Sequence, residues 1–193
     1  MGPRLLVITG TSGVGKTTIT SKIAASLGIG KVASTDTIRE VLRTQQSRKD
    51  SPALHRSSFE PAGRGAVSDW KETISAISME LAAVIKRSYM KGDDLLVEGV
   101  HLIPGGGVLD YWRSGGFRAC GVVLYVSNEK LHRQMIAERE KHNGKLVGHY
   151  LDNFDRIREI QKEMLVSAED SGWIAMDITS QGVDIGLIGR NLE

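Results

Sequence analysis

Gly10-Thr11-Ser12-Gly13-Val14-Gly15-Lys16-Thr17-Thr18 is the stretch that decides the fold. It matches the pattern G-x-x-x-x-G-K-[ST], in which glycines let backbone N–H groups wrap closely around phosphate oxygens. The helix that follows adds the positive end of its dipole. In this pattern the lysine reaches the β and γ phosphates, and the hydroxyl after it ligates Mg²⁺. The stretch therefore predicts a site for ATP and Mg²⁺, in which Lys16 is catalytic and Thr17 binds the metal. The predicted ATP-binding residues are Gly10, Ser12, Gly13, Val14, Gly15, Lys16, Thr17 and Thr18.

The residues on either side have the pattern of a strand, a loop and a helix. Residues 5–9 are a short apolar run typical of a buried parallel strand. Ile19, Ile23 and Leu27 recur every four residues on one helical face, and Gly28 is placed to end that helix. This context distinguishes the stretch from a glycine-rich turn with an incidental lysine.

Short apolar runs alternate with amphipathic stretches along the rest of the chain. Further strands are predicted at 31–34, 95–97, 119–126 and 173–177. Helices are predicted at 37–43, 67–91, 129–140 and 151–171, with a short helix or turn at 110–117 and a weaker helical tail. Residues 44–65 are polar and broken by prolines and glycines, so an irregular segment is expected there. Five strands alternating with helices predict an α/β three-layer sheet.

Composition limits the classes of protein to consider. A chain of 193 residues with 40% hydrophobic and 25% charged residues is expected to form one soluble domain spanning 1–193, with a small lid. The net charge of +2 and the lack of a basic stripe argue against a nucleic-acid partner. No apolar run approaches the roughly 18 residues that span a bilayer, so no membrane partner is expected and the cytoplasm is the predicted location. The single cysteine, Cys120, lies in an apolar run and is expected to be a buried structural thiol.

Polar residues are expected to gather where the predicted strands end. Ligands of such sheets bind beyond the carboxyl ends of the strands, where Asp36, Glu98, His101 and Asn128 lie. Asp36 and Arg39 are three residues apart at the start of a helix and project to similar sides. The carboxylate could accept the proton of an attacking hydroxyl or orient Mg²⁺-bound water, and the arginine could hold an anionic acceptor. An N-cap aspartate beside a surface arginine is the structural alternative.

Two more residues of this edge have open roles. Glu98 closes an apolar run, where a carboxylate commonly supports the metal of a phosphoryl-transfer site, directly or through water. A strand-end carboxylate bonded to local amides is the alternative. His101 is equally compatible with a structural histidine and with a ligand of the acceptor.

Two segments are locally basic. Residues 38–66 are predicted to cover the acceptor, since residues 38–64 contain six Arg or Lys against three acids. Residues 133–149 are predicted to form a mobile lid that neutralises charge and excludes water. Arg133 and Arg139 are its candidate catalytic arginines, beside Lys141 and Lys145. A solvated helix face is the alternative for this segment.

Five stretches, in order along most of the chain, carry a family resemblance. They are Gly10–Thr18 (GTSGVGKTT), Ala33–Arg43 (ASTDTIREVLR), Leu54–Phe59 (LHRSSF), Val97–Gly105 (VEGVHLIPG) and Tyr150–Gln161 (YLDNFDRIREIQ). Together they resemble the 2-phosphoglycerate kinase family, and the match is to its kinase core. The resemblance implies the fold of the P-loop small-molecule kinases, with a five-stranded parallel sheet in the order 2-3-1-4-5. It also implies transfer of the γ-phosphate of ATP to the free hydroxyl of 2-phosphoglycerate, giving 2,3-bisphosphoglycerate.

A phosphorylated hydroxy acid carries about three negative charges, so its pocket needs several cations. Asp36 would then be the base or would orient the hydroxyl. The predicted acceptor-binding residues are Asp36, Arg39, Arg43, Arg56, Ser57, Ser58, Glu98 and His101.

Three other functions stay open on the sequence alone. A kinase for a nucleoside, sugar, hydroxy acid or antibiotic would use the same loop on a different acceptor. An RNA-directed kinase would need a basic surface track, and the near-neutral charge argues against it. A non-catalytic nucleotide switch would bind nucleotide without an acceptor. The sequence also leaves open the preference for ATP over GTP and whether the chain forms a homodimer.

Overall fold

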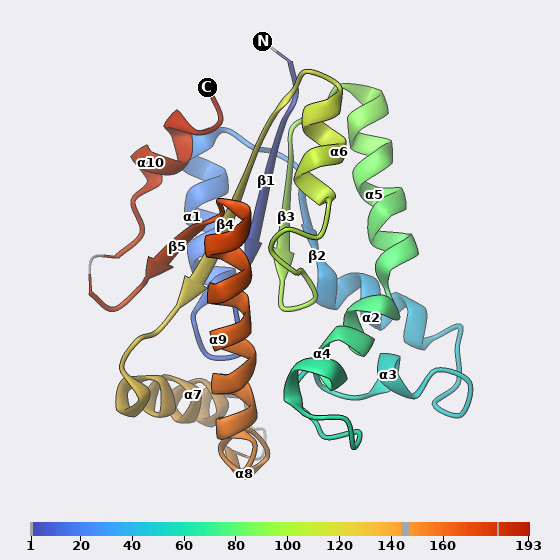
Figure 1. Ribbon diagram of the computed structural model, residues 1–193, viewed down its shortest axis with the longest axis vertical. Helices are drawn as coiled ribbons and strands as arrows, with labels where there is room; N and C mark the ends of the chain where they lie inside the picture. Colours follow the sequence, from blue (N-terminus) through green and yellow to red (C-terminus); the bar gives the residue numbers. More distant parts are fainter. Residues whose placement is uncertain (1, 144–146, 181) are drawn as a thin grey trace.

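A computed structural model describes residues 2–143, 147–180 and 182–193 (Figure 1). Its five strands form one sheet in the order β2-β3-β1-β4-β5, and all neighbouring strands are parallel. The strands are β1 (Arg4–Thr9), β2 (Val32–Ser34), β3 (Leu95–Gly99), β4 (Arg118–Tyr125) and β5 (Ile174–Asp177). The predicted fold class and strand order are confirmed.

The sheet is covered by helices on both faces because its central strands carry buried apolar side chains on both faces. Leu5 and Val7 of β1 pack on one face, and Leu6 and Ile8 pack on the other, as the alternation of a strand requires. Helices α4 (Ala66–Ser75), α5 (Ser78–Lys91), α6 (Val108–Ser114) and α9 (Phe154–Ser171) contribute core residues to the first face. Helices α1 (Lys16–Leu27) and α10 (Ile185–Arg190) contribute to the second.

The remaining helices gather at the edge where the strands end. They are α2 (Thr35–Arg43), α3 (Pro52–His55), α7 (Glu129–Asn143) and α8 (Val147–Leu151). Figure 1 shows α7 and α8 on one side of this edge and α2, α3 and α4 on the other. The loops after β1, β3 and β4 open between these two groups. This arrangement brings the residues that follow β1, β3 and β4 together at one edge of the sheet.

Two helix predictions need correction. The predicted helix 67–91 is two helices, because the chain breaks at Ala76 and Ile77. Ile77 is fully buried and packs in a small core with Leu42 and Leu54, which a straight helix on the sheet would not reach. The predicted loop 141–149 is partly helical, since α7 continues to Asn143 and α8 begins at Val147. Residues 144–146 of the predicted lid, including Lys145, lie outside the described residues.

Two kinds of feature are absent from the described ranges. No helix there is long and apolar enough to cross a bilayer. No group of three or more His, Cys, Asp or Glu side chains in the same ranges could hold a metal ion by itself.

Candidate active site

The phosphate loop joins the end of β1 to the start of α1 and lies tightly against two other elements. A Cβ on Gly10 would lie 2.5 Å from the carbonyl oxygen of Leu124 in β4. Gly13 has φ +86°, and a Cβ there would overlap Ile136 of α7. Only glycine combines this backbone conformation with such close approach. The sheet and α7 therefore hold the loop in shape, and Thr17 and Thr18 remain exposed at the start of α1.

Lys16, the first residue of α1, lies among several charged groups. Its Nζ donates a hydrogen bond to the carbonyl of Thr11 at 2.8 Å. Burial lowers the pKa of Lys16 to about 8, while the nearby carboxylates of Glu98 and Asp36 favour its charged form and Arg139 opposes it. The lysine therefore lies within electrostatic range of residues from β3, α2 and α7, and a bound anion would stabilise its charge.

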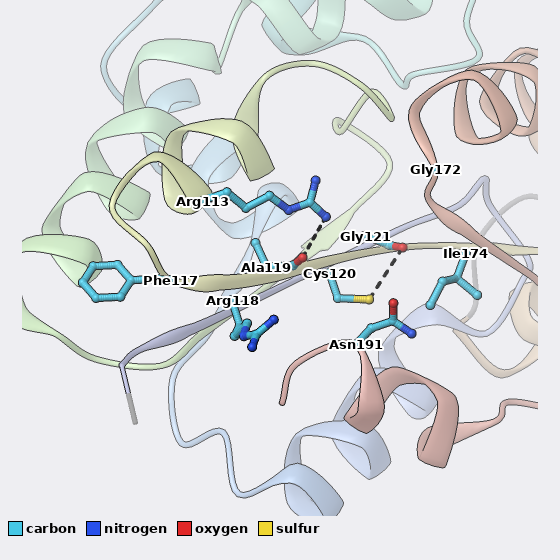
Figure 2. A pocket seen from close by; sticks show the side chains of 9 residues that line it. All are labelled: Arg113, Phe117, Arg118, Ala119, Cys120, Gly121, Gly172, Ile174 and Asn191. Atoms are coloured by element: carbon cyan, nitrogen blue, oxygen red, sulfur yellow. Dashed lines mark hydrogen bonds between the residues drawn. The ribbon is translucent and has the colours of Figure 1, made fainter.

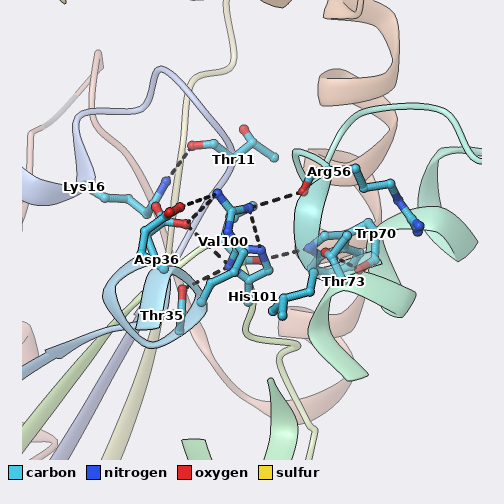
Figure 3. Close-up of polar contacts among 12 residues, drawn as sticks. Thr11, Lys16, Thr35, Asp36, Arg56, Trp70, Thr73, Val100 and His101 are labelled. Atoms are coloured by element: carbon cyan, nitrogen blue, oxygen red, sulfur yellow. Dashed lines mark hydrogen bonds and ion pairs between the residues drawn. The ribbon is translucent and has the colours of Figure 1, made fainter. Parts of the chain in front are cut away.

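His101 lies next to the start of α2 and is fully buried (Figure 3). Its Nδ1 is 3.2 Å from Thr35 Oγ1 and 3.7 Å from Asp36 Oδ1. Burial lowers the pKa of His101 to about 4, so the imidazole is neutral at physiological pH. Arg39 Nη1 lies 3.4 Å from Nε2 and donates to it, which leaves the proton on Nδ1, facing Thr35 and Asp36. The histidine thus anchors Arg39 and faces the carboxylate of Asp36.

Asp36 and Arg39 are two charged residues of α2, and Asp36 lies next to Lys16 (Figure 3). The Asp36 side chain is 59% exposed, and its Oδ1 is 3.8 Å from Arg39 Nη2. The Arg39 side chain is only 13% exposed, and its Nη1 also lies 3.4 Å from the carbonyl of Arg56. Its buried Nε has no hydrogen-bond partner in the part of the chain that the structure describes. An accessible carboxylate therefore stands next to a guanidinium that retains an unused donor.

The other arginines predicted to bind the acceptor contact protein groups. Arg43 donates to the carbonyl of Leu54 at 2.8 Å and to Glu40 at 2.6 Å. Arg56 points away from His101 in Figure 3 and donates to Glu72 at 2.6 Å. Among Arg39, Arg43 and Arg56, which all lie in the described ranges, only Arg39 forms a hydrogen bond with His101.

The remaining predicted acceptor residues occupy two places. Ser57 and Ser58 lie in the loop between α3 and α4. There Ser57 donates its backbone N–H to Glu60 at 2.5 Å, and Ser58 is buried. Glu98 is 8% exposed at the carboxyl end of β3, in register with Ile8 of β1 and Ser34 of β2. Glu98 therefore lies at the predicted edge, whereas the serines lie farther along the acceptor segment.

The two candidate lid arginines differ in their surroundings. Arg133 is 47% exposed, lies 3.4 Å from Asp155 Oδ1 and stacks its guanidinium 3.9 Å from the centre of the Phe154 ring. Arg139 has its guanidinium 5.8 Å from the Tyr150 ring centre, and its charge acts on Lys16. Of these two candidates, Arg139 is the one whose charge lowers the pKa of Lys16.

The sequence matches a known domain family. A family model described as an AAA domain matches residues 6–163, most of the chain. The chain belongs to the AAA domain family.

Curated proteins named 2-phosphoglycerate kinase are similar to this AAA domain. The one from Pyrococcus furiosus is 30% identical over 176 residues, which are 87% of this chain and 57% of the relative. The one from Methanocaldococcus jannaschii is 31% identical over 177 residues, 88% of this chain and 57% of the relative. These matches confirm the resemblance carried by the five motifs. The chain spans little more than half the length of these relatives.

A solved structure has the same fold. A protein of Chloroflexus aurantiacus j-10-fl aligns with this AAA domain at a TM-score of 0.61 and 16% identity, covering 98% of this chain and 96% of its own. At that identity the likeness establishes the fold alone.

Sequence reasoning missed His132, which links α7 of the AAA domain to the phosphate loop. Its ring is fully buried, and its Nε2 donates to the carbonyl of Ser12 at 2.8 Å. Burial lowers the pKa of His132, so the ring stays neutral. The available signal was its position four residues before Ile136, on the buried face of the helix. The same reasoning missed Asp69 and Arg156, which are described below.

A cavity of about 270 Å³ lies at the opposite edge of the sheet, near the start of β4 (Figure 2). It is lined by Arg113, Phe117, Cys120 and Asn191 among others, and Arg113 donates to the carbonyl of Ala119 at 2.9 Å. Burial raises the pKa of the Cys120 thiol to about 11, as suits a structural cysteine. This cavity lies far from the phosphate loop, and no carboxylate of the described chain lines it, so it lacks the acid–base groups found at the edge with Lys16.

Proposed function

We propose that this AAA domain transfers the γ-phosphoryl group of ATP to the hydroxyl of a small anionic acceptor, 2-phosphoglycerate, giving 2,3-bisphosphoglycerate. The observation that carries the proposal is the placement of Asp36, Arg39 and His101 beside Lys16 of the phosphate loop. A carboxylate and a guanidinium next to the triphosphate site suit a hydroxyl acceptor that bears negative charge. The names of the curated relatives support the same reaction.

The proposed chemistry is an in-line displacement. The acceptor hydroxyl oxygen forms a bond to the γ-phosphorus, the bond from that phosphorus to the β–γ bridging oxygen breaks, and ADP leaves. The hydroxyl proton passes to the carboxylate of Asp36. Lys16 neutralises charge on the β and γ phosphates, and Arg139 of the lid adds a second positive charge there. Arg39 binds an anionic group of the acceptor through its guanidinium.

The residues present fit a magnesium ion. Mg²⁺ prefers oxygen ligands and keeps several waters while bridging phosphates, so it needs only one or two protein oxygens. Two suitable oxygen ligands lie at this edge. They are the hydroxyl of the exposed Thr17 and the carboxylate of Glu98, whose charge raises the pKa of Lys16. They would hold the ion directly or through water. When bound, the ion would neutralise charge on the phosphate oxygens.

We further propose that residues 1–193 act as one kinase domain. In it, residues 38–66 bind the acceptor and residues 133–149 form the lid. The contact of Arg39 with the carbonyl of Arg56 supports the first role, because it joins α2 to the rest of that segment. The electrostatic effect of Arg139 on Lys16 supports the second.

A panel of acceptors tests the proposed function. ADP release would be followed with ATP and Mg²⁺ on 2-phosphoglycerate, 3-phosphoglycerate, glycerate, gluconate, shikimate and nucleosides, with Lys16→Ala as the blank. We expect turnover with 2-phosphoglycerate well above the other acceptors and none with the blank. Slow ATP hydrolysis that ignores every acceptor would refute the proposal, and preference for a neutral acceptor would refute the assigned role of Arg39.

A further inference from the structure

Two of the five sequence motifs, residues 54–59 and 150–161, supply no group to the proposed transfer step, yet they meet in the fold. Asp69 of α4 lies between them and is fully buried. Its carboxylate accepts hydrogen bonds from the backbone N–H of Ala62 at 2.8 Å, from the backbone N–H of Arg64 at 3.1 Å and from Arg156 Nη2 at 2.7 Å. Burial alone would raise the pKa of Asp69, but these hydrogen bonds outweigh burial and lower it, so the group is ionised.

Arg156 of α9 binds the other side of the same loop. Its Nε donates to the carbonyl of Phe59 at 2.7 Å, and its Nη2 lies 3.4 Å from the carbonyl of Glu60. The Asp69 carboxylate thus accepts hydrogen bonds from two N–H groups of the loop, and the Arg156 guanidinium donates to two carbonyls of the same loop. Residues 59–64 are wrapped around a single ion pair.

The loop held in this way extends to the acceptor site and to the lid. At its start, the carbonyl of Arg56 accepts from Arg39, the arginine beside His101. The Phe59 ring packs on Tyr150 of α8, with 5.0 Å between ring centres, and His149 Nε2 lies 3.2 Å from Glu60 Oε1. One loop therefore touches Arg39 at one end and α8 along its middle.

We propose that Asp69 and Arg156 are positioning residues for the acceptor. Their ion pair shapes residues 59–64, which dock on α8 and, through the hydrogen bonds between Glu60 and Ser57, hold the neighbouring Arg56 carbonyl against Arg39. The inference rests on the proposed function in that it takes Arg39 to bind the acceptor. The phosphate loop is held separately, by β4 and by Ile136 and His132 of α7. Loss of the ion pair should therefore weaken acceptor binding and leave nucleotide binding intact.

A second ion pair between α4 and α9, more exposed than Asp69–Arg156, is the control for loss of a bridge between these helices. Lys71 and Glu163 also join α4 to α9, with 2.7 Å between Nζ and Oε1, and their side chains form no hydrogen bond or ion pair with residues 56–64 in the described chain. Lys71→Gln removes this bridge between the same two helices. Arg156→Lys keeps the positive charge but cannot contact the carboxylate and two carbonyls in the geometry of a guanidinium. Asp69→Asn keeps the size of the side chain and removes its charge.

The experiment measures KM for the acceptor and for ATP, the thermal midpoint, and amide hydrogen exchange in residues 56–64. For Arg156→Lys and Asp69→Asn we expect the acceptor KM to rise by roughly tenfold to a hundredfold, since small misplacement of a binding group has effects of that size. The ATP KM should stay at the wild-type value, and the amides of Ala62 and Arg64 should exchange faster. Lys71→Gln should change neither KM. Equal changes in both KM values, or an acceptor KM unaltered by Arg156→Lys, would overturn the inference.

Failure of the proposed function would look different. If the wild-type protein phosphorylates another acceptor of the panel, the same KM comparison is made with that acceptor. If it phosphorylates none, the proposed function fails and hydrogen exchange decides whether the pair shapes the loop. Faster exchange in residues 56–64 with unchanged exchange in the phosphate loop would support the pair's role, and unchanged exchange in both would overturn it.

Discussion

Gly13→Ala tests whether the phosphate loop depends on its contact with α7. Gly13 has φ +86°, which costs a residue with a Cβ about 1–2 kcal/mol. The added Cβ would overlap Ile136, which is 1% exposed, and would lie 3.3 Å from His132 Cδ2, so the neighbours have little room to move. Overpacking of this kind costs about 1–3 kcal/mol. Together these effects disfavour the native loop by about 2–5 kcal/mol, or roughly thirtyfold to several thousandfold in an equilibrium constant.

The assay for this substitution combines ATP affinity by calorimetry with the free energy of unfolding in denaturant. We expect the cost to appear as weaker ATP binding if the loop moves, or as lower stability if the loop keeps its shape and the neighbours are strained. Adding Ile136→Ala to the Gly13→Ala protein should remove the part of the free-energy cost that comes from overpacking and leave the part that comes from the backbone conformation. Gly28→Ala is the matched control, because Gly28 has φ +66° but, apart from its two chain neighbours, no heavy atom of the described chain lies within 4 Å of its Cβ position. An ATP affinity and a stability both equal to wild type in Gly13→Ala would refute this account of the loop.

Three further predictions concern the charged groups of the site. Arg39→Met removes hydrogen-bond donors to an anionic group of the acceptor, each worth about 1.5–3 kcal/mol. The acceptor KM should therefore rise by roughly ten- to a hundredfold while the ATP KM stays constant. A parallel rise in both KM values would argue against an acceptor role for Arg39. Glu98→Gln should raise the Mg²⁺ concentration needed for half-maximal activity, measured in a magnesium titration at fixed ATP, and an unchanged titration would remove Glu98 from the metal site. Burial lowers the pKa of Lys16 from 10.5 in the unfolded chain to about 8 in the folded chain. Between pH 8 and 10.5 the unfolded chain therefore binds more protons at this group, so the free energy of unfolding rises with pH over that range. Unfolding measured from pH 8 to 10 should therefore show wild type gaining stability relative to Lys16→Met, and a constant difference would contradict the lowered pKa.

The sequence predicted the parts of the fold that depend on local pattern. The run 5–9, the glycines of the phosphate loop and the four-residue spacing after Lys16 all report on contacts within a few residues. The strand order followed from the family resemblance, and the sheet has that order. The break at Ile77 was missed because the apolar spacing continues through it, and only the distant Leu42 and Leu54 favour the bend.

The site was predicted less completely because its charges pair over long sequence distances. Counting basic residues over 38–64 placed Arg56 in the acceptor pocket, but its partner Glu72 lies outside that window. Asp69 and Arg156 are 87 residues apart, and no chemistry was assigned to the 150–161 motif that contains Arg156. By contrast, Asp36 and Arg39 share one helical turn, so their spacing alone indicated that they lie together.

Phosphorus NMR of the reaction of wild-type protein with ATP, Mg²⁺ and 2-phosphoglycerate tests the central claim most directly. The account predicts that the γ-phosphate signal of ATP is lost as a second phosphomonoester signal appears, coupled to the three-carbon acceptor, with ADP formed in equal amount. Asp36→Asn should slow this conversion, and Lys16→Ala should abolish it. Appearance of inorganic phosphate in place of the second phosphomonoester would contradict transfer to this acceptor.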